Sequence, residues 1–193
     1  LNGKDTRFLP FNQGNEGRAG NPPSDTGSAT NYLWNQVLSP DTLLRILRDY
    51  ALWEPDKKNP SKGFLIFPRF HQLRAVERVM NDVAEIGAGG RYLIQHSAGS
   101  GKTKTITWLA QRLSKYFNDE GQKVFNSVII VSDRTVLDRN ITESLELLQA
   151  SEGSIVYVDN LGGSKSKKLR EALIKGNRII SCTIQTFPAL AKN

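Results

Sequence analysis

Residues 92–103 read Y-L-I-Q-H-S-A-G-S-G-K-T, and this stretch decides the fold. The apolar residues 92–95 are typical of a short buried strand, and the residues after Lys102 repeat apolar positions at helical spacing. A strand, a glycine-rich loop and a helix in this order can bind phosphate. Backbone N–H groups and the positive end of the helix converge on the phosphate oxygens. The stretch therefore predicts a nucleotide site.

Each residue type in this loop has a separate predicted role. Gly99 and Gly101 lack a Cβ and let the backbone approach phosphate, while Lys102 supplies a positive charge for the β and γ phosphates. The Thr103 hydroxyl is suited to Mg²⁺ bound with the nucleotide. The strict pattern has glycine where this chain has His96, which we interpret as a packing residue. A glycine-rich turn with no ligand is the alternative, and the strand and helix context argues against it. The predicted contacts to ATP in the loop are Ser97, Ala98, Gly99, Ser100, Gly101, Lys102 and Thr103.

Short apolar runs alternate with helical patterns over the rest of the chain. This alternation is typical of an α/β fold whose parallel sheet is covered by helices on both faces. The predicted strands are 92–95, 127–131, 154–158 and 178–183, and the predicted helices are 102–117, 135–149 and 165–175. In such sheets, ligands bind at the carboxyl ends of the strands.

The first part of the chain has a different character. Residues 1–38 are rich in Gly, Pro and Asn and predict a linker, and residues 39–66 predict a helical lead-in to the α/β region, 67–193. Ser39 is expected to cap a helix that has Pro40 in its first turn and ends near Pro55. A second helical period covers residues 73–86 and stops at glycines.

Composition limits the remaining possibilities. Lys and Arg total 26 against 19 Asp and Glu, a net charge of +7, which permits an anionic partner such as nucleic acid. The single cysteine, Cys182, cannot form an internal disulfide or a cysteine-rich zinc cluster. No apolar run approaches the roughly 20 residues of a membrane span, so we expect no membrane partner and a cytoplasmic setting.

A second motif precedes the loop by about thirty residues. Residues 67–72 read F-P-R-F-H-Q. The Gln72 side chain carries an amide donor and a carbonyl acceptor, which suits bidentate recognition of an adenine edge. A surface position at a helix start is the other interpretation of this residue.

Together, residues 67–72, 91–103 and 131–138 resemble the R (restriction and translocation) subunit of type I restriction enzymes. This subunit is a superfamily 2 helicase-like motor, and it also has histidine at the position of His96. Residues 5–12 and 179–188 resemble the exit from its nuclease domain and a later motor segment. The resemblance implies a P-loop NTPase (RecA-like) lobe, incomplete in this chain, preceded by the linker and the lead-in.

The resemblance also implies a function for individual residues. Gln72 would read adenine, and Asp133 and Arg134 would lie near bound DNA. Thr183, Gln185 and Thr186 would lie near the DNA backbone. The whole subunit would use ATP and Mg²⁺ to translocate double-stranded DNA before cutting it, as a type I site-specific deoxyribonuclease. Its partners would be the modification (methyltransferase) and specificity subunits.

We expect this chain to be a fragment of such a subunit. It contains no acidic D-E-x-H-like motif and no second motor lobe, and hydrolysis needs the acid and a transition-state cation. The isolated chain should therefore bind ATP weakly and hydrolyse it negligibly. Two alternatives remain open: another superfamily 2 DNA helicase or a type III restriction subunit, and a non-hydrolytic nucleotide- or DNA-binding scaffold.

Overall fold

The computed structural model describes residues 11–25, 27–56, 58–59, 61–133, 141–147, 155–158 and 164–187. Its helices are the π-helical turn Leu33–Val37, α1 (Pro40–Asp49), α2 (Phe70–Ile86), α3 (Lys102–Ser114), α5 (Lys165–Ile174) and the 3₁₀ turn Ile184–Thr186. Residues 141–147 are also helical. The strands are β1 (Leu52–Pro55), β2 (Gly63–Ile66), β3 (Val128–Ser132), β4 (Ile155–Tyr157) and β5 (Ile179–Thr183). None of the helices in these ranges is long and apolar enough to span a membrane.

The second half of the described chain contains a three-stranded parallel sheet. Its strand order is β3-β5-β4, so β5 lies in the centre and Ile179 is in register with both Val128 and Ile155. All five residues of β5 are buried. Three of the four predicted strands are therefore confirmed. The central strand β5 is buried on both faces, as its apolar run predicts, whereas Ile129 and Val131 of the edge strand β3 are exposed.

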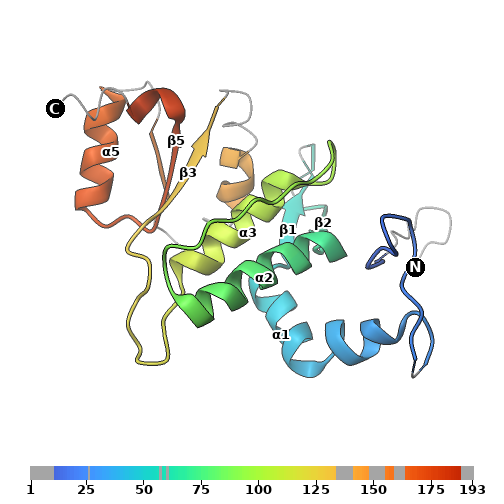
Figure 1. Ribbon diagram of the computed structural model, residues 1–193. Coiled ribbons are helices and arrows are strands. Elements are labelled where there is room, and N and C mark those ends of the chain that lie inside the picture. Colours follow the sequence, from blue (N-terminus) through green and yellow to red (C-terminus); the bar gives the residue numbers. More distant parts are fainter. Residues whose placement is uncertain are drawn as a thin grey trace.

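Helices cover both faces of this sheet, as the alternating pattern predicts. In Figure 1, α5 lies on one side of the strands, and α3 with the helix at 141–147 lies on the other. Successive side chains of a strand point to opposite faces. Accordingly, Ile179 packs with Ala110 of α3, and its neighbour Ile180 packs with Leu169 of α5. The α/β architecture expected of a P-loop NTPase is present.

The predicted strand at 92–95 is wrong. In the part of the chain that the structure describes, residues 91–97 are extended but pair with no strand, and Leu93 is 92% exposed. The segment instead runs beside α2, where the Tyr92 hydroxyl donates a hydrogen bond to the Asp82 carboxylate.

The lead-in also differs from the expectation. Its helix ends at Asp49 instead of near Pro55, because Leu52–Pro55 pairs antiparallel with Gly63–Ile66. A Cβ on Gly63 would lie 2.5 Å from the Glu54 carbonyl oxygen, so this close pairing requires glycine. Ser39 does not cap α1 with its side chain, since its hydroxyl donates to the Gln36 carbonyl. Pro40 does begin the helix, as predicted.

The other helix bounds follow the sequence closely. The helix predicted at 73–86 begins three residues earlier, at Phe70, and ends before Gly87, whose φ is +73°. The helix predicted at 102–117 ends at Ser114, and that predicted at 165–175 ends at Ile174. Of the helix predicted at 135–149, only residues 141–147 are described, and they are helical.

One apolar cluster joins the lead-in to the helix that follows the glycine-rich loop. Ile46 of α1, Val76 of α2 and Trp108 of α3 are all fully buried in it. The indole of Trp108 packs against the Tyr50 ring, with ring centroids 5.6 Å apart. The helix carrying the predicted nucleotide site is thus packed on one side against α1 and α2, and on the other against the sheet.

Candidate nucleotide-binding site

The glycine-rich loop, residues 96–103, turns directly into α3 and is called the phosphate loop below. Gly99 and Gly101 have φ values of +73° and +85°, a conformation that side chains disfavour. Gly101 occupies the N-cap position of α3, and its carbonyl accepts the first helical hydrogen bond, from the Thr105 N–H. The two glycines are therefore required by the backbone path of the loop.

Lys102 lies across the phosphate loop. Its Nζ donates hydrogen bonds to the carbonyl oxygens of Ser97, at 2.8 Å, and His96, at 3.1 Å. Lys102 is exposed at the N-terminus of α3. A bound phosphate would therefore interact both with the lysine charge and with the positive end of the helix dipole. The site thus fits the polyphosphate of a nucleotide.

Thr103 follows on the first turn of α3 and is partly buried. With Gly101 it lines an open cavity of about 640 Å³, whose wall also carries Glu54, Glu143 and Glu146. Among the described residues, no group of three histidine, cysteine or acidic side chains could hold a metal ion by itself. A Mg²⁺ ion at Thr103 would therefore depend on the phosphates of the nucleotide for most of its ligands.

The structure brings Gln72 to the phosphate loop. Its side chain is 4% exposed, its Oε1 accepts the Arg69 N–H at 2.9 Å, and its Nε2 donates to the Gly101 carbonyl at 2.9 Å. The two sequence motifs that suggested a nucleotide site are thus in direct contact. Both ends of this amide are bonded to backbone, so reading an adenine edge would require Gln72 to exchange one of these partners.

Sequence reasoning did not single out His71. Its Nε2 lies 3.0 Å from the Ser100 carbonyl oxygen, and its ring meets the His96 ring edge to face with centroids 4.9 Å apart. Burial, together with His71 and Lys102, lowers the pKa of His96. The available signal was the pair of unusual histidines, one beside Gln72 and one at the glycine position of the loop.

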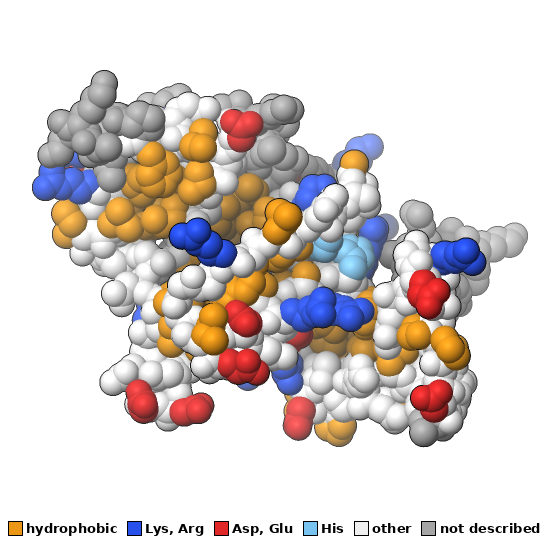
Figure 2. All heavy atoms as spheres, in the orientation of Figure 1, with side chains coloured by type: hydrophobic (Ala, Val, Ile, Leu, Met, Phe, Trp, Pro, Cys, Tyr) orange, Lys and Arg blue, Asp and Glu red, His pale blue; other side chains and the backbone are white. Residues whose placement is uncertain are grey.

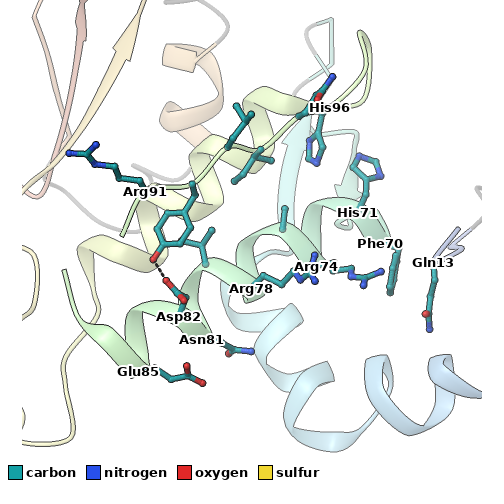
Figure 3. Close-up of a pocket in the computed structure, with 16 residues that line it drawn as sticks. Gln13, Phe70, His71, Arg74, Arg78, Asn81, Asp82, Glu85, Arg91 and His96 are labelled. Carbon is teal, nitrogen blue, oxygen red and sulfur yellow. Dashed lines mark hydrogen bonds between the residues drawn. The ribbon is translucent and has the colours of Figure 1, made fainter. Parts of the chain in front are cut away.

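A cavity of about 910 Å³ adjoins these histidines. Figure 3 shows it between α2 and the extended segment 91–96, with Arg74 and Arg78 projecting from α2 and Arg91 from the facing segment. Tyr92 points to Asp82 farther along the helix. In the space-filling view, basic side chains gather beside a histidine on this face (Figure 2). Basic side chains therefore lie beside the phosphate loop on the α2 side, whereas the cavity at Thr103 has acidic side chains in its wall.

A largely buried ionic cluster holds α3 against α1 and α2. Glu77 of α2 accepts hydrogen bonds from the Tyr50 hydroxyl, Arg45 Nη1 and Arg112 Nη1, each at 2.7 Å. Burial acts to raise the pKa of Glu77, but the hydrogen bonds and the two guanidinium charges outweigh it and lower the pKa. Glu77 is thus an ionised carboxylate that ties α1, α2 and α3 together.

The residues predicted to lie near DNA form a second group. Thr183, Gln185 and Thr186 lie where β5 ends, and the Gln185 Nε2 donates to the carbonyl of Asp133, just after β3. Thr183 Oγ1 also receives a hydrogen bond from Lys165 Nζ at 3.4 Å. The carboxyl ends of two parallel strands therefore bring these residues together. Arg134 lies outside the described residues.

The sheet with helices on both faces, the glycine turns and the Lys-Thr start of α3 define a P-loop nucleotide-binding protein of the α/β class. A family model described as SWI2/SNF2 ATPase matches residues 71–193. The chain belongs to this family of helicase-like ATPases, which implies the use of ATP and usually Mg²⁺. The match begins at His71 and includes both Gln72 and the phosphate loop. Neither the curated proteins nor the solved structures contain a match to this chain.

Proposed function

We propose that this chain is part of the ATP-dependent DNA translocase and endonuclease subunit of a type I restriction-modification enzyme. The family match supports a helicase-like ATP-dependent motor. The finer assignment rests on the resemblance of residues 67–72, 91–103 and 131–138 to the R subunit. The contact of Gln72 with Gly101 is the observation that supports it best, because it joins the first two of these segments in one site.

ATP bound at the phosphate loop would supply the free energy of phosphoryl transfer, and Mg²⁺ would neutralise the developing charge. The residues of the chain bind the nucleotide and orient its phosphates. The N–H groups near Gly99 and Gly101 contact phosphate oxygens, Lys102 leaves the carbonyls of His96 and Ser97 to pair with the β and γ phosphates, and Thr103 directs its hydroxyl to Mg²⁺. Gln72 contacts the adenine edge.

The partner in this proposal is double-stranded DNA, together with modification and specificity subunits. The group at the ends of β3 and β5 supports a place for the DNA backbone, because ligands of parallel sheets bind at the carboxyl ends of strands. Thr183, Gln185 and Thr186 offer hydroxyl and amide groups there, and Lys165 adds a positive charge. Such groups contact phosphate without reading sequence.

The test is the substitution Lys102→Ala in the full-length subunit. It should abolish ATP-dependent translocation and cleavage of unmodified DNA while leaving the far-ultraviolet circular dichroism and the thermal midpoint unchanged. Lys167→Ala, an exposed lysine on α5, is the matched control and should retain both activities. Full translocation by the Lys102→Ala subunit would contradict the proposal.

Other outcomes would identify the alternatives. Strand separation without cleavage would indicate another superfamily 2 helicase, and cleavage at a fixed short distance from the recognition site would indicate a type III restriction subunit. Binding of ATP or DNA by the full-length protein without any hydrolysis would indicate a scaffold. For the 193-residue chain alone, we expect weak ATP binding and no turnover above background.

A further inference from the structure

His71 contacts the phosphate loop at both of its ends. Its Nε2 lies 3.0 Å from the carbonyl oxygen of Ser100, near the end of the loop, and its ring packs edge to face on His96, at the start. The interplanar angle of the two rings is 89°. A single side chain from the first turn of α2 thus contacts the backbone turn that precedes α3 and the residue that opens the loop.

The direction of the hydrogen bond determines what it does to the loop. A carbonyl oxygen can only accept, so His71 Nε2 carries the proton and donates it to Ser100. In a trans peptide unit, the C=O of one residue and the N–H of the next point in opposite directions. Holding the Ser100 carbonyl toward α2 therefore turns the Gly101 N–H away from α2.

The neighbouring peptide unit is held in the same way. Gln72 Nε2 binds the Gly101 carbonyl, which turns the Lys102 N–H away from α2 as well. At the opening of the loop, Lys102 Nζ binds the carbonyls of His96 and Ser97. With the Ser100 and Gly101 carbonyls held by side-chain donors, the Gly101 and Lys102 N–H groups both point away from α2, where they can converge on an anion.

We propose that His71 is a positioning residue of the nucleotide site, which orients the Gly101 N–H through Ser100 and fixes the start of the loop through His96. This role rests on nucleotide binding at the phosphate loop. It also accounts for histidine at position 96, where a glycine would leave the His71 ring without its edge contact. The Nδ1 of His96 is buried without a hydrogen-bond partner, so the ring serves here as a packing surface.

Two substitutions separate the hydrogen bond from the ring contact. His71→Phe keeps a ring against His96 and removes the donor, whereas His71→Gln keeps an N–H donor of similar reach and removes the ring. The full chain would be titrated with a fluorescent ATP analogue in the presence of Mg²⁺, and urea unfolding would confirm that each variant is folded. Lys167→Ala serves as the control.

Loss of the hydrogen bond should weaken binding of the analogue about three- to tenfold in His71→Phe, since a net hydrogen bond contributes this much. His71→Gln should bind about twofold more weakly than the unchanged chain, because it keeps the donor and loses only the ring contact with His96, a partial rescue that a merely structural role would not produce. His96→Ala should be non-additive with His71→Phe, because the two side chains are in contact. AMP, with its single phosphate, should be less affected than ATP.

Two results would overturn the inference. One is His71→Phe binding as tightly as the unchanged chain, and the other is equal loss in His71→Phe and His71→Gln with additive effects at His96. Neither outcome would damage the proposed function as long as Lys102→Ala loses binding. Failure of the unchanged chain to bind the analogue at all would instead count against nucleotide binding itself, and the role of His71 would fall with it.

Discussion

Oε1 of Glu77 lies 2.7 Å from Nη1 of Arg112, and this ion pair joins α2 to the helix that follows the phosphate loop. Both side chains are largely buried, with 19% and 16% of their surfaces exposed. The same Oε1 accepts the hydroxyl hydrogen of Tyr50, and Oε2 accepts a hydrogen bond from Arg45. Both oxygens of this carboxylate therefore have charged or hydroxyl donors.

Replacing Glu77 by Gln should destabilise the chain by about 3 kcal/mol, because it leaves two guanidinium groups beside a neutral amide in a mostly buried place. Urea unfolding followed by tryptophan fluorescence measures the loss. Glu85→Gln, an exposed position on the same helix, is the matched control and should change stability by less than about 0.5 kcal/mol. Equal effects of the two substitutions would show that the ionic cluster contributes nothing.

The same carboxylate should govern stability in acid. The pKa of Glu77 is lower in the folded chain than in the unfolded chain, so its contribution is complete above about pH 4.5. Below this, the unfolded state takes up the proton first, and stability falls until the pH has passed through the folded pKa. Urea midpoints measured between pH 7 and pH 3 should therefore fall less steeply below pH 4.5 in Glu77→Gln. Parallel profiles for the two proteins would refute this assignment.

The two glycines of the phosphate loop should not be equivalent. Gly99→Ala should cost about 1–2 kcal/mol from its positive φ alone, since a Cβ there would meet nothing within 4 Å. A Cβ on Gly101 would lie 2.5 Å from Gln72 Nε2, so Gly101→Ala should also break that hydrogen bond, at about 1 kcal/mol more. Urea unfolding of both variants gives the difference, which should vanish when both are repeated in a Gln72→Ala background.

The unpaired segment before the loop gives a further prediction. Leu93→Ala should change the unfolding free energy by less than about 0.5 kcal/mol, because the side chain is almost fully exposed. Leu169→Ala on α5, where the leucine is fully buried, should cost about 2–5 kcal/mol. The amides of residues 92–95 should also exchange their hydrogens rapidly, as expected of a segment outside the sheet. A large cost at Leu93 would mean that this segment does belong to the sheet.

The sequence was most informative where local chemistry and tertiary packing agree. The glycines and Lys-Thr of residues 99–103 predict a loop and a helix start, and the apolar runs at 127–131 and 178–183 predict strands that the sheet confirms within one residue at each end. The apolar run at 92–95 forms no strand, because this segment runs beside α2 and pairs with neither edge of the sheet. Composition alone does not reveal whether an apolar run joins the sheet or packs beside a helix.

Contacts between residues far apart in sequence explain the features that the sequence did not predict, both in the lead-in and at the site. The polar residues 55–61 predict a turn, but the pattern does not predict the hairpin of β1 and β2, because each strand has only four residues and β1 follows α1 so closely that residues 52–55 are assigned to the helix. The motif of Gln72 suggested a ligand, but its bond to Gly101 joins residues far apart in sequence. The role of His71 depends on the direction in which one carbonyl points, a property of the folded backbone.

The central place of β5 has a consequence for the order in which the chain can fold. During synthesis, β3 and β4 leave the ribosome before β5, and in the described part of the chain each of them pairs only with β5. Their backbone groups and apolar side chains must therefore wait for residues 179–183. Completion of this sheet is a late, concerted event, and a chain interrupted before residue 179 would carry two strands with exposed edges, which favours aggregation.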